Sequence, residues 1–113
     1  MKIKEMNNPD ENIEKLTNKS NVVLDFYADW CAPCKNFTRI LSSIENDIQL
    51  KSIDLIKINV DEYQTLMKKF DVKSLPTIVF AKKSNTGSYD QVFKKVGSMD
   101  SKSFIDTVVS IYE

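Results

Sequence analysis

Hydrophobic and polar positions along the chain follow two periods, which predict short strands alternating with amphipathic helices. Residues 22–28 are apolar almost throughout, which is typical of a central strand buried on both faces. The segment that follows carries apolar residues at helical spacing, namely Phe37, Ile40, Leu41, Ile44 and Ile48. We therefore expect a buried strand that leads into an amphipathic helix.

The N-terminal region predicts a short edge strand over 2–5 and then a helix. Asn8 is placed to cap this helix and Pro9 to lie in its first turn. Ile13 and Leu16 are expected to face the core. Further along the chain, the pattern predicts a strand over 55–60.

In the C-terminal half, Asp61 is expected to cap a helix, with Gln64 completing a capping box. Pro76 opens the next strand, a turn over 84–87 follows, and a strand over 89–96 returns to Gly97. The last helix is expected to begin at Asp100 or Ser101. The element order β-α-β-α-β-α-β-β-α predicts an α/β fold with helices on both faces of a mixed sheet.

Composition limits the classes of function. The chain has 113 residues with 16 basic and 16 acidic side chains, so its formal net charge is zero. We expect a single domain over 1–113, a monomer, and no nucleic-acid or membrane partner. The polar N-terminus has no apolar stretch of signal-peptide length, so we expect a cytoplasmic protein.

The two cysteines, Cys31 and Cys34, are three residues apart where the buried strand gives way to the helix. A helix N-terminus stabilises a thiolate, and two thiols this close can form a disulfide, which permits two-electron redox chemistry. With no histidine in the chain, one copy cannot build a conventional zinc site. A four-cysteine site shared by two chains and a pair of buried structural cysteines remain as alternatives.

Four segments in order and spacing resemble the thioredoxin family. They are Asp25–Lys35, Lys57–Asp61, Ser74–Thr77 and Val96–Gly97. The resemblance implies a thioredoxin fold, with four to five strands and about four helices, and a thiol–disulfide oxidoreductase that acts as a general protein disulfide reductase. A disulfide oxidase or isomerase of the same fold is one alternative, and a binding module whose main role is not redox is another.

The resemblance also implies roles for residues at the centre of the site. Cys31 is expected to be the nucleophile and Cys34 the resolving cysteine. Asp25 is a carboxylate in a strand predicted to be buried, so its pKa should be raised, and it is the best available acid and base for Cys34. The alternative for Asp25 is a strand-edge acid that reaches water. Lys57 either adjusts the charge of Asp25 or is an ordinary outward lysine.

A shallow apolar surface for extended substrates is expected around Cys31. Its residues are Trp30, Ala32, Pro33, Leu75, Pro76, Gly97 and Ser98. The family has a cis peptide bond before the proline at Pro76, which leaves the Leu75 backbone free to pair with a substrate strand. The alternative is a plain proline at the start of a strand. Two positions depart from the family pattern: Ala32 replaces a common glycine and Arg39 a common proline.

The resemblance implies partners rather than bound cofactors. Disulfide-containing proteins are the expected substrates, and a thioredoxin reductase is expected to restore the dithiol. The FAD and NADPH belong to that reductase, so the chain itself is expected to hold no cofactor and no metal, only a reversible Cys31–Cys34 disulfide.

Overall fold

One mixed sheet of five strands runs through the computed structural model, which describes residues 1–8 and 10–113. The strands are β1 (Lys2–Glu5), β2 (Asn21–Tyr27), β3 (Asp54–Asn59), β4 (Thr77–Lys83) and β5 (Tyr89–Val96). Their order is β1-β3-β2-β4-β5, with β3 parallel to β1 and β2, and β4 antiparallel to β2 and β5. The predicted central strand is therefore confirmed as β2.

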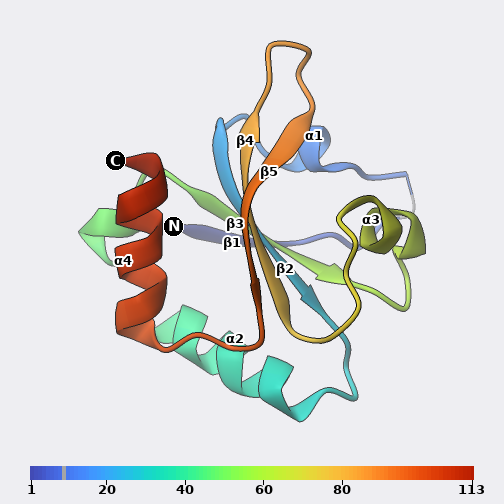
Figure 1. The fold of residues 1–113 in the computed structure, drawn as a ribbon, viewed down its shortest axis with the longest axis horizontal. Coiled ribbons are helices and arrows are strands. Elements are labelled where there is room, and N and C mark those ends of the chain that lie inside the picture. The colour runs from blue at the N-terminus through green and yellow to red at the C-terminus, as the bar shows by residue number, and fades with distance from the viewer. Residues whose placement is uncertain (9) are drawn as a thin grey trace.

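Helices cover both faces of this sheet. They are α1 (Ile13–Leu16), α2 (Ala32–Ile44), the short 3₁₀ helix η1 (Ile48–Leu50), α3 (Gln64–Lys69) and α4 (Ser101–Tyr112). Figure 1 shows α2 and α4 on one side of the sheet and α1 and α3 on the other. This arrangement confirms the predicted fold class.

Two separate hydrophobic clusters fill the spaces between sheet and helices. Because successive side chains of a strand point to opposite faces, β2 contributes to both clusters. Leu24 and Phe26 pack toward α1 and α3, where the Phe26 and Phe70 rings lie 5.8 Å apart. Val23 packs toward α2 and α4, where Phe37 belongs to the same cluster. Burial on both faces fixes the position of β2.

The first two helices each differ from the prediction at one end. The first helix begins later than expected: Asn12 is its N-cap, and the Asn12 side chain accepts a hydrogen bond from the Lys15 amide. Asn8 instead accepts a hydrogen bond from the Asp10 amide, and the predicted place of Pro9 lies outside the described residues. The second helix ends at Ile44, so Ile48 lies in η1 and is 74% exposed rather than facing the core.

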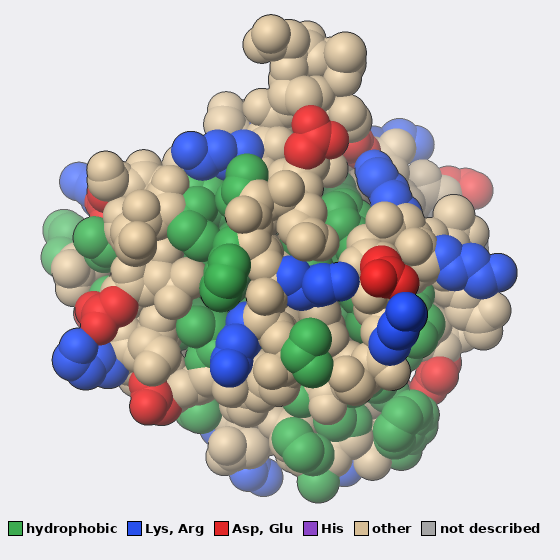
Figure 2. All heavy atoms as spheres, in the orientation of Figure 1, with side chains coloured by type: hydrophobic (Ala, Val, Ile, Leu, Met, Phe, Trp, Pro, Cys, Tyr) green, Lys and Arg blue, Asp and Glu red, His purple; other side chains and the backbone are tan. Residues whose placement is uncertain are grey.

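The edge strand β5 differs from a regular half-buried strand. Its pairing with β4 shifts between Phe80 and Ala81, which leaves Val92 opposite no partner residue. Val92, Phe93 and Val96 are exposed, and lysines lie beside them in the sequence. On the face drawn in Figure 2, small hydrophobic areas alternate with basic side chains. A bulge and charged neighbours are common protections of a sheet edge against pairing with another chain.

A buried carboxylate joins three segments at the start of β3. Asp54 accepts a hydrogen bond of 2.6 Å from the Thr17 hydroxyl. The ammonium groups of Lys4 and Lys19 lie 3.2 and 3.4 Å from its two oxygens. Burial alone would raise the pKa of Asp54, but the hydroxyl and the two lysines outweigh it and hold the pKa below its usual value. The charged form is therefore the one that links β1, β3 and the segment before β2.

We predict that Asp54→Asn lowers the free energy of unfolding by about 1–3 kcal/mol near neutral pH, because the lysines lose their charged partner. The depressed folded-state pKa means that wild type loses the same stabilisation as the pH falls through that pKa. Urea unfolding near neutral pH and at about pH 3 should therefore show that the difference in free energy of unfolding between wild type and Asp54→Asn is smaller in acid. Asp106→Asn, which removes an exposed pair with Lys102, is the control and should change little. An equal gap at both pH values would contradict the prediction.

Candidate active site

The two cysteines lie where β2 passes into α2. Cys31 is the N-cap of α2, and its Sγ accepts a hydrogen bond of 3.2 Å from the backbone N–H of Cys34. Pro33 lies in the first turn, where its missing N–H costs no helical hydrogen bond. Cys31 and Cys34 form a disulfide, with their Cα atoms 5.3 Å apart. The sequence prediction of a cysteine pair at a helix start is confirmed.

Both cysteines are buried, but they line different cavities. Cys31 is 5% exposed and Cys34 is 2% exposed. Cys31 lines a broad groove together with Trp30 and Leu75, whereas Cys34 lines a smaller pocket together with Lys57. We expected Cys34 to be less exposed than Cys31, but the exposed fractions of the two residues differ little. The two cysteines differ mainly in the cavity that each one lines.

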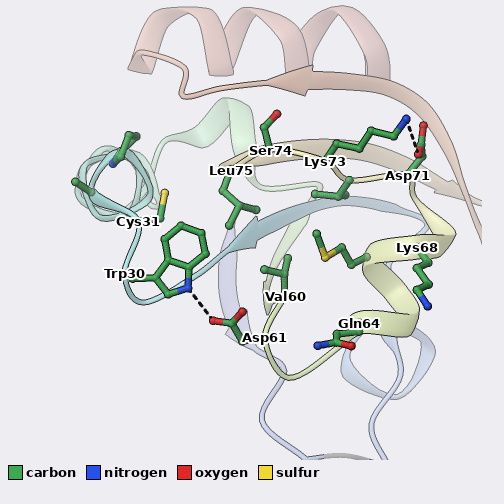
Figure 3. Close-up of a pocket in the computed structure, with 14 residues that line it drawn as sticks. Trp30, Cys31, Val60, Asp61, Gln64, Lys68, Asp71, Lys73, Ser74 and Leu75 are labelled. Carbon is green, nitrogen blue, oxygen red and sulfur yellow. Dashed lines mark hydrogen bonds and ion pairs between the residues drawn. The ribbon is translucent and has the colours of Figure 1, made fainter.

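The groove beside Cys31 has a volume of about 860 Å³ and extends from Cys31 to Gln64 and Lys68 of α3 (Figure 3). Four of the predicted surface residues line it: Trp30, Ala32, Pro33 and Leu75. Sequence reasoning missed the far wall, which includes Val60, Gln64, Met67, Lys68, Val72 and Lys73. The sequence assigns Val60 to a strand and Gln64 and Met67 to a helix, and no local pattern indicates that α3 faces the cysteines.

The indole of Trp30 is 71% exposed, and a hydrogen bond holds it at the edge of the groove. Its Nε1–H donates to the carboxylate of Asp61 over 3.0 Å (Figure 3). The predicted capping role of Asp61 is wrong, because α3 begins at Gln64 with Tyr63 as its N-cap and no side-chain cap. A contact with a residue far away in sequence has replaced the local cap.

The remaining predicted surface residues lie beside the groove, outside its lining. The Leu75–Pro76 peptide bond is cis, as the resemblance implied. The Gly97 N–H donates to the Pro76 carbonyl over 2.8 Å, and Gly97 has a φ of +96°, which favours glycine. Ser98 follows and is half-buried. Within the described residues, neither backbone group of Leu75 has a hydrogen-bond partner.

Asp25 is fully buried in the middle of β2. Neither oxygen of its carboxyl group has a hydrogen-bond partner among the described residues. Burial raises the pKa of Asp25 to about 7; the charge of Lys57 lowers it and that of Glu5 raises it further. The alternative of a strand-edge acid that reaches water is wrong.

Lys57 lies directly opposite Asp25 in the register of β2 and β3. Its ammonium group donates to the Thr38 hydroxyl over 2.8 Å and lies 4.4 Å from the centre of the Tyr27 ring. No ion pair joins Lys57 to Asp25 in the part of the chain that the structure describes. The charge of Lys57 lowers the pKa of Asp25 with no ion pair between them among the described residues, and a role of Lys57 in the reaction stays a prediction.

Comparison with known proteins gives the family. The thioredoxin family model matches residues 2–110 of the chain. The chain belongs to the thioredoxin family. It is 32% identical over 101 residues to thioredoxin from Rickettsia bellii, an alignment that covers 88% of this chain and 90% of that one. It is 35% identical over 82 residues to Thioredoxin-1 from Drosophila melanogaster, covering 73% of this chain and 75% of the relative.

Solved thioredoxin structures share the fold. An N21Q mutant thioredoxin from Halobacterium salinarum superposes with a TM-score of 0.81 at 28% identity, covering 99% of this chain and 92% of that one. The thioredoxin of Trichomonas vaginalis gives 0.77 at 26% identity, covering 98% and 97%. Family membership together with the Cys31–Cys34 disulfide identifies a thiol–disulfide oxidoreductase, and it favours a redox role over a binding module.

The described residues contain no cluster of three or more histidine, cysteine, aspartate or glutamate side chains arranged to hold a metal ion. Across those same positions, no helix has the length and apolar character needed to cross a membrane.

We predict that Asp25→Asn stabilises the fold at high pH. Since the folded-state pKa of about 7 lies above the ordinary aspartate value of 3.8 that applies to the unfolded chain, ionisation of Asp25 destabilises wild type increasingly as the pH rises between these values. A shift of this size corresponds to about 4 kcal/mol above neutral pH. Urea unfolding should show that Asp25→Asn has a higher free energy of unfolding than wild type, by an amount that approaches this value at high pH and is almost zero in acid.

The matched control for this prediction is Asp29→Asn. Asp29 is an exposed carboxylate four residues further along the chain, so its replacement should leave the free energy of unfolding nearly unchanged at both pH values. A gain from Asp25→Asn that is equally large in acid would contradict the raised pKa.

Proposed function

We propose that the chain is a general protein disulfide reductase in which Cys31 attacks the substrate and Cys34 resolves the intermediate. The observation that carries this proposal is the position of Cys31: it is the N-cap of α2 and lines the groove of about 860 Å³, next to an exposed indole. A backbone N–H directed at Sγ favours the thiolate, and a broad, largely apolar groove suits many extended protein segments.

The proposed reaction consists of two exchange steps. The thiolate of Cys31 attacks one sulfur of a substrate disulfide, which forms a mixed disulfide and releases the other substrate sulfur as a thiolate. The thiolate of Cys34 then attacks Cys31 Sγ, which forms the Cys31–Cys34 disulfide and releases the second substrate sulfur. The substrate gains two electrons and the cysteine pair loses two.

Asp25 is proposed as the group that takes the proton from Cys34 before the second step and returns it when the pair is reduced again. Asp25 lies opposite Lys57 in the register of β2 and β3, and Lys57 lines the same pocket as Cys34. A pKa of about 7 suits both proton uptake and release near neutral pH. In this scheme the charge of Lys57 keeps that pKa from rising further.

Substrate binding is proposed to combine apolar contact with backbone pairing. Trp30, Ala32 and Pro33 border the groove on the α2 side, and the free N–H and C=O of Leu75 suit an added strand. Beside them, the Pro76–Gly97 hydrogen bond supports placing Pro76, Gly97 and Ser98 at the rim of this surface.

The proposed cellular setting follows the family. The whole chain, 1–113, is proposed to act as a single thioredoxin-like domain and as a monomer in the cytoplasm. Disulfide-containing proteins are the proposed substrates, and a thioredoxin reductase that holds FAD and uses NADPH is proposed to restore the dithiol. The relatives named above support this setting, since both are thioredoxins.

We predict that Cys34→Ser accumulates a covalent adduct with a disulfide-containing protein such as insulin, because the intermediate on Cys31 has lost its resolving thiol. Non-reducing gels and intact mass should show a one-to-one adduct that dithiothreitol removes. Cys31→Ser is the control and should give almost none, since Cys34 does not line the groove. No adduct with Cys34→Ser, or equal adducts with both variants, would refute the assignment.

A further inference from the structure

The far wall of the groove is built on α3, a short helix with little support of its own. α3 spans only Gln64–Lys69, a length at which an isolated helix is unstable in water. Its N-terminus has no side-chain cap, and none of its residues is fully buried. Nevertheless α3 and the segment 71–75 line the groove from Gln64 round to Leu75 (Figure 3). Contacts at the end of α3 must therefore fix this wall.

The C-terminal turn of α3 is a Schellman motif. The Asp71 N–H donates to the Lys68 carbonyl over 3.1 Å. The Val72 N–H donates to the Met67 carbonyl over 3.0 Å. Met67 and Val72 pack in the same hydrophobic cluster, and both line the groove. The shape of the wall thus depends on this turn.

The motif places Asp71 in the left-handed region, with a φ of +51°. In this conformation the Cβ atom of an L-residue crowds the following carbonyl, so glycine adopts it most readily. Aspartate tolerates it better than most residues and still needs support from the surrounding structure. The exposed Asp71 carboxylate provides little support, because its only ion-pair partner among the described residues is the exposed Lys73 at 3.7 Å.

Lys94 of β5 provides this support. Its ammonium group donates to the carbonyl of Phe70 over 3.2 Å and to that of Asp71 over 3.0 Å. Both carbonyls lie at the C-terminal end of α3, where a positive charge is favourable. Among the described residues, no other side chain donates to the backbone of 64–72, and Lys94 forms no ion pair. One side chain thus connects the edge strand to the turn.

Sheet register explains why Lys94 reaches the turn and its neighbour Lys95 does not. Lys94 is opposite Val79 of β4, and Val79 belongs to the hydrophobic cluster under α1 and α3. Directly opposed residues point to the same face of a sheet, so Lys94 points toward α3. Lys95 is opposite Ile78, which packs in the cluster under α2 and α4. The two lysines therefore form a matched pair for comparison.

We propose that Lys94 is a positioning residue for protein substrates, because it holds the turn that keeps the groove in shape beside Cys31. Leu75 follows Asp71 by four residues, so a displaced turn also displaces the Leu75 backbone. If the groove is formed in only a fraction of the molecules, the apparent affinity for an extended segment falls by that fraction. A small disulfide needs access to Cys31 alone. Since it concerns how the groove binds substrate, this role of Lys94 rests on the proposed function.

The first experiment compares a protein disulfide with a small one as oxidants of the reduced protein. Lys94→Met removes the ammonium group and keeps the aliphatic stem. The second-order rate constant for insulin should fall roughly three- to fivefold, and that for 2-hydroxyethyl disulfide should change less than about 1.5-fold. Lys94→Arg keeps a cationic donor and should restore the insulin rate to within about 1.5-fold of wild type. Lys95→Met is the control and should change neither rate.

Three results would overturn the proposal: equal losses with both disulfides, an unchanged insulin rate in Lys94→Met, or an equal loss in Lys95→Met. Failure of the proposed function would differ from all three, because wild type would then reduce neither disulfide.

The second experiment tests whether Lys94 acts through the left-handed turn. Glycine adopts this conformation without strain, so Asp71→Gly should let the turn form without Lys94. Adding Lys94→Met should slow the insulin reaction less than about 1.5-fold in Asp71→Gly protein, and roughly three- to fivefold or more in Asp71→Ala protein. Both backgrounds lack the carboxylate and differ only at the Cβ atom. Equal losses in the two backgrounds would overturn the proposal.

The third experiment observes the turn directly by amide hydrogen exchange. In Lys94→Met, the amides of Asp71 and Val72 should exchange at least roughly tenfold faster than in wild type. The amide of Asp47, which donates to the Ile44 carbonyl at the end of α2, should exchange at the wild-type rate. Equal acceleration at all three amides, or none at Asp71 and Val72, would contradict a specific role of Lys94 in holding the turn.

Discussion

Asp25 holds a carboxyl group in the central strand of the sheet, where no described residue gives either of its oxygens a hydrogen bond. Burial of an unpartnered carboxylate opposes folding, so it persists only where the surrounding structure is fixed. That structure is β2, which is paired on both sides and packed on both faces. The same strand leads directly into α2, so one rigid segment carries the carboxyl group and positions the disulfide at its end.

The disulfide is asymmetric because its two sulfurs meet different surroundings. Cys31 lies at the N-terminus of α2 and lines a groove bordered by Trp30 and α3. Cys34 lies one turn further and lines a cationic pocket. Lys57 lies in the lining of this pocket, where its ammonium group donates a hydrogen bond to Thr38. Its positive charge also lowers the pKa of the buried Asp25.

The sequence was sufficient to predict the element order, the buried strand and the cysteine pair, because each depends on local periodicity or spacing. It was not sufficient where contacts between distant segments decide the outcome. Ile48 continues the helical spacing of α2, yet the helix has already ended at Ile44. Asp61 is a good local cap, yet it binds the Trp30 indole instead. The far wall of the groove could not be predicted because it depends on how α3 packs against the sheet.

The measurement that tests the central claim most directly is the pH profile of the resolving step, in wild type and in Asp25→Asn. The step is followed by mixing reduced protein with a disulfide substrate and quenching with acid to quantify the mixed disulfide. Wild type should show a rate that rises with an inflection near pH 7, the pKa of Asp25. Asp25→Asn should be at least roughly tenfold slower and should lack that inflection. An unchanged rate and an unchanged inflection would contradict a role for Asp25 as the proton acceptor of Cys34.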